Sequence, residues 1–265
     1  MNDLLALARK AAASAAEHIR ARRPTGLVEV AKTKSSQTDL VTEIDISCEK
    51  LIRELILGER PTDGFIGEEG QDLVGPSGVE WVVDPIDGTV NFVHQLPRYA
   101  VAIAACRGDE TEVAVVVDVA NHIEFYASKG QGAWRVDWSA DGEPVRLRGP
   151  AQTQTELMLV ATGFNYVREV RQRQALAVAK LLPRVADIRR FGSAALDLTD
   201  LAQGRLDAYV EQGLKPWDLI PGGLIATEAG VVLTGPGGRP SERLVVAANA
   251  AGINRFETLV EECGF

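Results

Sequence analysis

Hydrophobic and polar positions alternate along this chain in two rhythms, one typical of helices and one of strands. Apolar residues at helical spacing, many of them alanines, predict helices over residues 2–22 and 42–57. The residues between these helices, 27–42, lack that spacing and are expected to be extended or looped. A short apolar strand is predicted at 65–67, and the cluster of Gly and Pro within 70–80 predicts a mobile loop.

The later sequence is rich in short apolar runs that are typical of strands. Runs at 99–106 and 112–119 predict two strands, and a third run at 122–127 could pair with them. The segment 135–150 is polar, with a predicted turn at Asp141-Gly142. Further strands are predicted at 157–161, 186–190, 207–211, 231–234 and 244–247, and helices at 167–182, 193–203, 217–229 and 251–262. Helices and strands are first grouped and then alternate, so we expect an α+β fold with layered sheets and helices.

Composition limits the class of protein. The chain has 265 residues, of which 46% are hydrophobic, and this is enough for a sizeable core. Since no internal repeat or low-complexity linker interrupts it, we expect a single domain over 1–265, with approximate halves at 1–150 and 151–265. Three cysteines without a CxxC pair argue against a disulfide framework and fit a reducing cytosol. Neither a long apolar run nor a leader is present, so we expect a cytoplasmic protein without a membrane span.

The charge of the chain bears on its partners. The net charge is −9, and an acidic protein gains nothing from the counterion release that drives nucleic-acid binding. We therefore expect no direct nucleic-acid binding. The basic cluster Arg20, Arg22 and Arg23 ends the first predicted helix, where cations meet the negative end of the helix dipole, and is interpreted as a solvated helix end.

The segment 81–92 carries the strongest chemical signal. Asp84 and Asp87 lie three residues apart at the end of an apolar strand, and Gly88-Thr89 follows where a helix could begin. Carboxylate oxygens are ligands that Mg²⁺ prefers. Backbone N–H groups and a hydroxyl at a helix start suit a phosphate oxygen. The segment therefore predicts metal-dependent phosphoryl chemistry.

Three other acidic signals lie at strand ends or helix starts, at Asp45, Glu68 and Asp218. Each has an ordinary explanation alone, since an Asp at a helix start is usually an N-cap worth about 1 kcal/mol. Glu68 with its acidic neighbour could be solvated surface, and Asp84 before a proline could mark a strand-ending turn. Two cations about 3.5–4 Å apart need several surrounding carboxylates from different elements, which is the pattern found here.

The ordered motifs resemble those of the inositol monophosphatase family, within the wider lithium-sensitive, Mg²⁺-dependent sugar-phosphatase superfamily. Residues 84–92 are similar to its first signature and 217–230 to its second, although the latter ends in Ala-Gly-Val rather than Ala-Gly-Gly. Residues 67–69 and 34–45 are similar to two further segments, so the resemblance runs from about residue 3 to 262. It implies a layered αβαβα sandwich, of the inositol monophosphatase and fructose-1,6-bisphosphatase type, that assembles as a homodimer.

The resemblance implies two or three Mg²⁺ ions per active site. Glu68, Asp84 and the backbone carbonyl of Ile86 would hold the first ion, and Asp84, Asp87 and Asp218 the second. A third, weaker ion would be bound partly by Glu68 through water. A bound metal lowers the pKa of water, so the resemblance implies attack by water and no protein nucleophile.

Catalytic roles follow from the same resemblance. Gly88 and Thr89 would bind the phosphate, and Thr89 and Asp45 would orient the attacking water and accept its proton, together with Glu68. Lys34 would support the mobile loop or its metal site, although a solvated loop cation is the simpler alternative.

Substrate specificity is expected from the later half. Gly192-Ser193-Ala194 resembles a segment whose backbone faces the alcohol of the substrate, and the metal ligands Asp87 and Asp218 are expected to contact the substrate as well. Glu211 matches the family acid that hydrogen-bonds inositol hydroxyls, although it could merely end a strand. His94 invites a general-acid role, but a polar residue near the rim is the favoured interpretation.

These residues lead to one function and two alternatives. The leading hypothesis is hydrolysis of myo-inositol monophosphate, a small phosphorylated polyol, to myo-inositol and phosphate. The alternatives are a phosphatase for histidinol phosphate, fructose 1,6-bisphosphate or a nucleotide phosphate, and a regulatory protein that binds the transcription machinery. Lithium inhibition is also expected, since Li⁺ could replace one Mg²⁺ at an oxygen-rich site without supplying equal charge.

Overall fold

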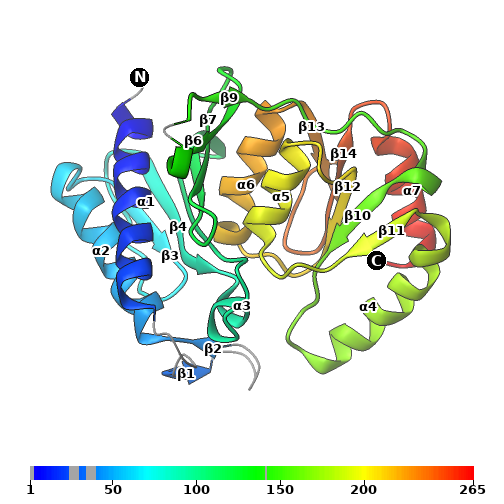
Figure 1. Ribbon diagram of the computed structural model, residues 1–265, viewed down its shortest axis with the longest axis horizontal. Helices are drawn as coiled ribbons and strands as arrows, with labels where there is room; N and C mark the ends of the chain where they lie inside the picture. Colours follow the sequence, from blue (N-terminus) through cyan, green and yellow to red (C-terminus); the bar gives the residue numbers. More distant parts are fainter. Residues whose placement is uncertain (1–2, 24–29, 34–39, 141) are drawn as a thin grey trace.

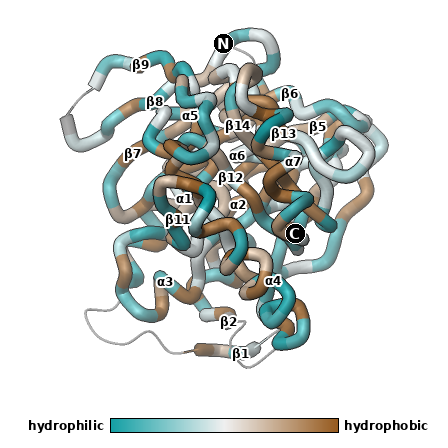
Figure 2. The backbone as a smooth tube through the Cα atoms, turned by 90° about the vertical axis from the view of Figure 1, so that its right-hand side faces the viewer, coloured by the Kyte–Doolittle hydropathy of each residue, from teal (hydrophilic) through white to brown (hydrophobic). Residues whose placement is uncertain are grey.

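The computed structural model describes residues 3–23, 30–33, 40–140 and 142–265, whose helices and sheets stack in five layers (Figure 1). The layers alternate between helices and sheets, which confirms the αβαβα sandwich. Figure 2 shows hydrophobic segments gathered in the middle of the molecule, around α6 (Pro216–Glu228) and β12 (Ala208–Glu211). Within the described residues, no helix combines the length and the apolar character that a membrane crossing requires.

The first layer consists of α1 (Asp3–Arg22) and α2 (Glu43–Glu59), which pack against each other and against the larger sheet. Buried alanines on α1, among them Ala8 and Ala12, have small side chains and let this helix lie close to its neighbours. Thr42 caps α2, because its side-chain oxygen accepts the backbone N–H of Asp45 at 3.3 Å.

The second layer is a seven-stranded sheet in the order β3-β4-β5-β6-β7-β8-β9, in which only β3 and β4 are parallel neighbours. Its strands are β3 (Gly64–Gly67), β4 (Val79–Asp87), β5 (Ala100–Arg107), β6 (Glu110–Asp118), β7 (Ile123–Ser128), β8 (Ala133–Asp137) and β9 (Val145–Arg146). Side chains alternate across a strand, and both faces of β5 are buried. Val101 and Ile103 join the core under α1 and α2, whereas Ala102 and Ala104 join the core on the opposite face.

The third layer consists of α5 (Ala194–Ala202) and α6, which cover this opposite face of the sheet. The fourth layer is a five-stranded sheet in the order β11-β10-β12-β14-β13. Its other strands are β10 (Leu159–Thr162), β11 (Asp187–Arg189), β13 (Val231–Thr234) and β14 (Val245–Asn249). The helices α4 (Arg168–Leu181) and α7 (Ile253–Cys263) form the fifth layer over a separate apolar core.

Two features near the middle of the chain differ from the sequence-based expectation. Strand β4 continues beyond Asp84 to Asp87, and a register shift against β5 accommodates the two residues between them. The alternative of a strand-ending turn at Asp84 is therefore wrong. The polar segment 135–150 contributes to β8 and to the edge strand β9, and alternation of apolar residues did not reveal either strand.

Short elements complete the fold near the lower end of the first sheet (Figure 1). The strands β1 (Lys32–Thr33) and β2 (Leu40–Val41) pair antiparallel, and α3 (Thr89–Val93) begins immediately after β4. The residues that join β1 to β2 include Lys34, so its expected supporting role lies outside the described residues.

Candidate active site

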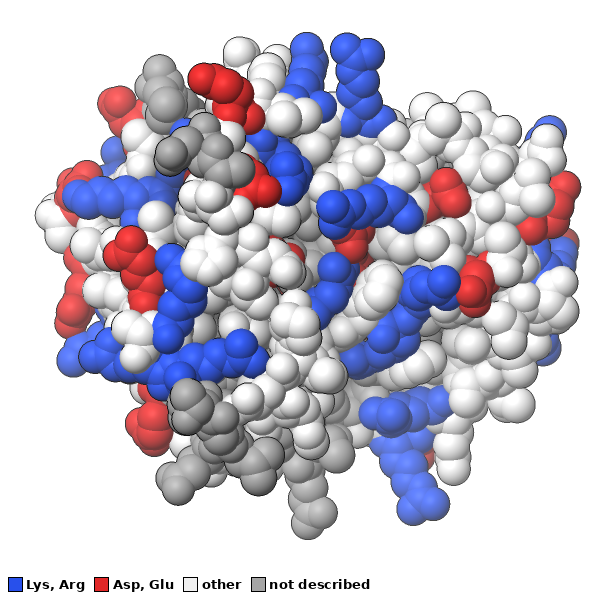
Figure 3. Space-filling view, in the orientation of Figure 1, with Lys and Arg blue, Asp and Glu red and all other residues white. Residues whose placement is uncertain are grey.

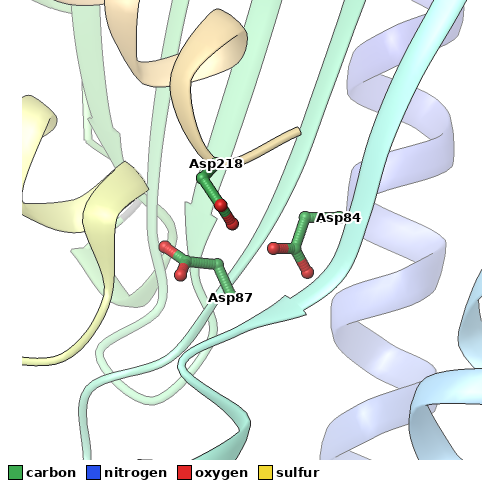
Figure 4. Close-up of side chains that lie close together, drawn as sticks. All are labelled: Asp84, Asp87 and Asp218. Carbon is green, nitrogen blue, oxygen red and sulfur yellow. The ribbon is translucent and has the colours of Figure 1, made fainter. Parts of the chain in front are cut away.

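Three carboxylates converge between the two sheets. Asp84 and Asp87 come from the end of β4, and Asp218 comes from the first turn of α6. One carboxylate oxygen from each of them lies within 4.8 Å of the others. Figure 4 shows the three side chains pointing toward one another, although Asp218 is more than 130 residues from the other two along the chain. The structure thus brings together the two acidic motifs that the sequence placed far apart.

Hydrogen bonds orient each carboxylate of this group. The backbone N–H of Ile86 donates to Asp84 Oδ1 at 2.9 Å, so the irregular end of β4 folds back onto its own side chain. Asp87 Oδ2 accepts the Ser193 hydroxyl at 2.6 Å and the Ala195 N–H at 2.7 Å, both from the start of α5. Asp218 Oδ2 accepts the backbone N–H of the residue that precedes α6 at 2.7 Å. The remaining oxygens can therefore face a common point.

The electrostatics of the three carboxylates favour a cation. Burial, followed by the neighbouring charges of Glu68, Asp87 and Asp218, raises the pKa of Asp84 well above its usual range. Burial and the charges of Asp87 and Glu68 do the same to the pKa of Asp218. Burial also raises the pKa of Asp87, against the lowering effect of its hydrogen bonds from α5. Crowded, buried oxygen donors are the environment in which a hard divalent cation such as Mg²⁺ binds, so the residues present fit this ion.

A cavity of about 350 Å³ opens onto these residues. Its lining includes nearly all of the site residues expected from the sequence, namely Glu68, Asp84, Ile86, Asp87, Gly88, Thr89, Gly192, Ser193, Ala194, Glu211 and Asp218. Two cations, Arg190 and Lys215, also line it. Figure 3 shows Lys and Arg side chains around the middle of this face, with acidic side chains recessed between them. The cavity thus combines a carboxylate-rich lining with two cationic side chains.

Asp45 is not among the described residues that line the cavity, but it is hydrogen-bonded to Thr89, which does line it. The Thr89 hydroxyl is 3.0 Å from Asp45 Oδ1 and 2.9 Å from the backbone carbonyl oxygen of Ile86. Because a hydroxyl has one proton, Thr89 can donate to only one of these acceptors at a time. Burial raises the pKa of Asp45 to about 6, although hydrogen bonds from Thr42 and Thr89 oppose this effect. Asp45 can therefore exchange a proton near neutral pH.

Gly88 shapes the turn between β4 and α3. Its φ of +93° lies in the left-handed region, which favours glycine. A Cβ at this position would also lie 3.0 Å from the carbonyl oxygen of Arg98 and 3.1 Å from that of Gly192. The close approach brings the first turn of α3 next to the segment that precedes α5, and both line the cavity.

Glu211 lies at the end of β12, in the five-stranded sheet, and lines the same cavity as the β4 motif. The Tyr209 hydroxyl donates to Glu211 Oε2 at 2.5 Å. Gly163 makes room for this carboxylate, because a Cβ at Gly163 would lie 2.0 Å from Glu211 Oε1. Burial raises the pKa of Glu211 to about 7, although the Tyr209 hydrogen bond and the charge of Arg190 oppose the shift. Glu211 thus both ends a strand and presents an acidic group to the cavity.

His94 is placed differently from a catalytic acid. It follows the last residue of α3, is exposed, and is not among the described residues that line the cavity. The favoured interpretation, a polar residue near the rim, stays a prediction.

Sequence reasoning missed several residues that hold the site together. Asn91 donates from its side-chain amide to the carbonyl oxygens of Arg98 and Phe191, both at 2.8 Å. Arg98 in turn donates to Asp197 at 2.8 Å and to Asp200 at 2.7 Å on α5. These contacts tie the α3 turn to the α5 start, which carries the partners of Asp87. No spacing rule links them, although Asn91 lies within the first signature.

A model of the inositol monophosphatase family matches residues 1–262. The chain belongs to the inositol monophosphatase family. Members of this family are phosphatases, so the protein is an enzyme of that class. The inositol-1-monophosphatase SuhB of Mycobacterium tuberculosis strain H37Rv is 43% identical over 265 residues, which cover 94% of this chain and 90% of the relative. A protein of Escherichia coli strain K12 that is named Nus factor SuhB is 38% identical over 236 residues, covering 88% of this chain and 85% of the relative.

Solved structures of family members show the same architecture. Mycobacterium tuberculosis SuhB superposes with a TM-score of 0.83 at 38% identity, covering 98% of this chain and 96% of that chain. The inositol monophosphatase of Thermotoga maritima superposes with a TM-score of 0.85 at 28% identity, covering 98% of each chain. The family assignment therefore rests on sequence and on fold.

Proposed function

We propose that this phosphatase hydrolyses myo-inositol monophosphate to myo-inositol and phosphate in a Mg²⁺-dependent reaction. The observation that carries the proposal is the placement of the Asp84, Asp87 and Asp218 carboxylates and the acidic Glu211 around one cavity. The three Asp carboxylates suit a metal and the phosphate beside it, and Glu211 suits the hydroxyl groups of a polyol. Relatives named inositol-1-monophosphatase, at 43% identity, support this choice of substrate.

The proposed metal ligands are those that line the cavity. Glu68, Asp84 and the carbonyl oxygen of Ile86 would hold one Mg²⁺, and Asp84, Asp87 and Asp218 a second, with Glu68 contributing through water to a weaker third. Bound Mg²⁺ would supply the positive charge that neutralises the phosphate and lowers the pKa of water. The hydrogen bonds from Ser193 and Ala195 to Asp87 would keep its free oxygen directed at the metal and the leaving group.

The chain's own residues would position the nucleophile and move its proton. Thr89, by donating to Asp45, leaves its oxygen free to accept a hydrogen bond from an attacking water. That water would lose its proton through Thr89 toward Asp45, whose pKa of about 6 permits acceptance near neutral pH. Glu68 would assist on the same side. Backbone N–H groups of Gly88 and Thr89 would bind phosphate oxygens, because the chain turns into α3 at this point.

The substrate alcohol would occupy the other side of the cavity. Glu211, held by the Tyr209 hydroxyl, would accept hydrogen bonds from ring hydroxyls, and the backbone of residues 192–194 would face the same ring. We also propose that the enzyme works in the cytoplasm as a homodimer, which its cysteine content and the family resemblance support.

Phosphate release from a panel of substrates under Mg²⁺ titration tests the proposal. The panel compares kcat/KM for myo-inositol 1-phosphate, histidinol phosphate, fructose 1,6-bisphosphate and a nucleoside monophosphate. The expected result is Mg²⁺-dependent release that is fastest with the inositol ester. A tenfold preference for histidinol phosphate would overturn the substrate, and absence of Mg²⁺-dependent release from every member would overturn the reaction itself.

Binding to the transcription machinery is the second candidate function. It is supported by relatives that are named Nus factor SuhB, at 38% identity over 88% of this chain. Asp84→Asn separates the two roles, because it removes a carboxylate of the active site without altering the surface. If a strain that carries only this inactive variant grows as the wild type does, the binding role is supported. If it shows the defect of the deletion strain, catalysis accounts for the phenotype.

A further inference from the structure

Helix α2 contacts the turn that carries Glu68. Glu49 lies in the middle of this helix with only 3% of its surface exposed. Its Oε2 accepts the backbone N–H of Glu69 at 2.7 Å, and this N–H belongs to the peptide group that joins Glu68 to Glu69. The hydrogen bond therefore restrains the orientation of the peptide immediately after Glu68.

Two glycines leave the space that the Glu49 carboxylate occupies. A Cβ at Gly67 would lie 2.5 Å from Glu49 Oε2, and a Cβ at Gly70 would lie 2.5 Å from Glu49 Oε1. Since real Cβ atoms do not approach so closely, any side chain at either position would displace the carboxylate or the turn. The backbone on both sides of Glu68 thus wraps around a single buried acidic group.

Arg53, one helical turn after Glu49, completes this arrangement. Its guanidinium lies 3.5 Å from Glu49 Oε1, which compensates the buried negative charge. It also donates to the carbonyl oxygen of Gln71 at 2.8 Å and lies over the ring of Phe65, 4.2 Å from the centroid. Helix α2 therefore contacts the turn 67–70 beside Gly67 and at the Glu69 N–H, and contacts the next residue, Gln71, at its carbonyl oxygen.

We propose that Glu49 is a positioning residue for the metal site, because its carboxylate fixes the turn 67–70 and thereby directs Glu68 toward Asp84. The inference rests on the proposed function, since it assumes that Glu68 is a Mg²⁺ ligand. Glu49 is not among the described residues that line the cavity, so it acts through the backbone of its neighbour rather than on the reacting atoms. Groups that orient metal ligands typically affect metal affinity about 10–100-fold.

Three substitutions of Glu49 separate the effect of side-chain length from the effect of side-chain charge. Glu49→Gln keeps an acceptor oxygen at the same distance and removes the charge. Glu49→Asp keeps the charge beside Arg53 but withdraws the acceptor by one methylene from the Glu69 N–H. Glu49→Ala removes both. Glu54→Gln is the matched control, because Glu54 lies on the same helix, is exposed and pairs only at 3.8 Å with Lys50.

Mg²⁺ affinity, measured by isothermal titration calorimetry on the folded proteins, is the decisive readout, and thermal unfolding is recorded in parallel. We expect affinity to fall about 10–100-fold in Glu49→Asp and Glu49→Ala, to stay within about threefold in Glu49→Gln, and to be unchanged in Glu54→Gln. A purely structural role would lower the unfolding temperature without changing the affinity of the folded protein. Wild-type affinity in Glu49→Asp would overturn the inference, as would a loss in Glu49→Gln equal to that in Glu49→Asp.

The same experiment separates this inference from the proposed function. If the wild type neither binds Mg²⁺ nor releases phosphate, the proposed function is wrong. The role of Glu49, which depends on that function, is then wrong as well. If the wild type does both and the Glu49 variants keep its affinity, only the role of Glu49 is wrong. Should Glu49→Ala not fold, Glu49→Asp and Glu49→Gln still decide the question, because both keep a polar side chain in the buried site and Glu49→Gln also keeps its volume.

Discussion

The hydroxyl of Thr89 lies 3.0 Å from the carboxylate of Asp45, and this single contact joins the start of α3 to the start of α2 across 44 residues of sequence. Asp45 is itself fixed by the backbone N–H of Thr42 at 3.0 Å and by the Thr42 hydroxyl. The pair therefore offers a fixed acceptor behind a hydroxyl that faces the cavity. This geometry suits transfer of a proton away from a water beside the phosphate.

Replacement of Asp45 should reduce turnover more than substrate binding. Asp45→Asn keeps the shape and the hydrogen bond to Thr89 but removes the acceptor of the proton, so kcat should fall by about 10²–10⁴-fold with KM nearly unchanged. Steady-state phosphate release measures both constants. Glu43→Gln serves as the control, since Glu43 is an exposed acidic residue in the same first turn of α2. A comparable loss in both variants would contradict the role of Asp45.

The pH dependence of kcat/KM should report the same group. Burial raises the pKa of Asp45 to about 6, so the carboxylate is largely protonated at pH 5 and largely ionised at pH 8. Only the ionised form can accept a proton, and kcat/KM should therefore decline about tenfold per pH unit below about pH 6. Profiles at saturating Mg²⁺ test this point. An identical acidic limb in Asp45→Asn would assign the decline to another group.

The crowded carboxylates should make the metal-free protein less stable at pH 7 than at pH 5. Burial and mutual repulsion raise the pKa of Asp84 and Asp218 in the folded state above their unfolded values. Their stabilising contribution is therefore present at low pH and is lost as the pH rises through the folded-state pKa. Asp84→Asn should raise the unfolding temperature at pH 7 in EDTA and abolish the increase produced by Mg²⁺.

Differential scanning calorimetry with EDTA or Mg²⁺, at both pH values, measures these effects. Asp72→Asn provides the comparison, because Asp72 is an exposed residue in the segment before β4. If Asp84→Asn were less stable than the wild type in EDTA at pH 7, repulsion among the carboxylates would not be a dominant cost in the metal-free state.

Tyr209 should influence which alcohol the enzyme accepts. Its hydroxyl holds Glu211 at 2.5 Å, and a hydrogen bond to a charged group contributes about 1.5–3 kcal/mol. Tyr209→Phe frees the carboxylate, so KM for myo-inositol 1-phosphate should rise about tenfold or more. KM for 4-nitrophenyl phosphate, which has no ring hydroxyls, should change little. Tyr126→Phe on β7 is the control, because Tyr126 is not among the described residues that line the cavity, and equal effects on both substrates would refute a role in specificity.

Most of the fold was predictable because its cores repeat simple patterns. The predicted helix at 2–22 is α1, and the predicted strands at 99–106 and 112–119 are β5 and β6, since runs of small and branched apolar residues mark buried elements. The strands β8 and β9, the last two in the order of the larger sheet, escaped prediction because their residues are mostly exposed or half-buried and show no alternation of apolar and polar residues.

The candidate site was predictable only where side chains carry the chemistry. Acidic residues in ordered motifs pointed to the cavity, and the cavity lining includes Glu68, Asp84, Asp87 and Asp218. Roles that depend on contacts with the backbone could not be predicted, because the spacing of residue types along the sequence does not indicate them. Glu49 binds an N–H that lies 20 residues away, and no side-chain pattern encodes that contact.

Lithium should inhibit phosphate release in the millimolar range. Asp84, Asp87 and Asp218 form an oxygen-rich group that balances divalent charge, and Li⁺ could occupy one Mg²⁺ position while supplying only half of that charge. The phosphate and the leaving oxygen would then be less well neutralised, and turnover should fall. Activity measured across millimolar LiCl, with NaCl at equal ionic strength as the control, tests this expectation. Because Na⁺ controls for screening, equal responses to the two salts, or complete insensitivity to Li⁺, would show that this ion does not enter the site.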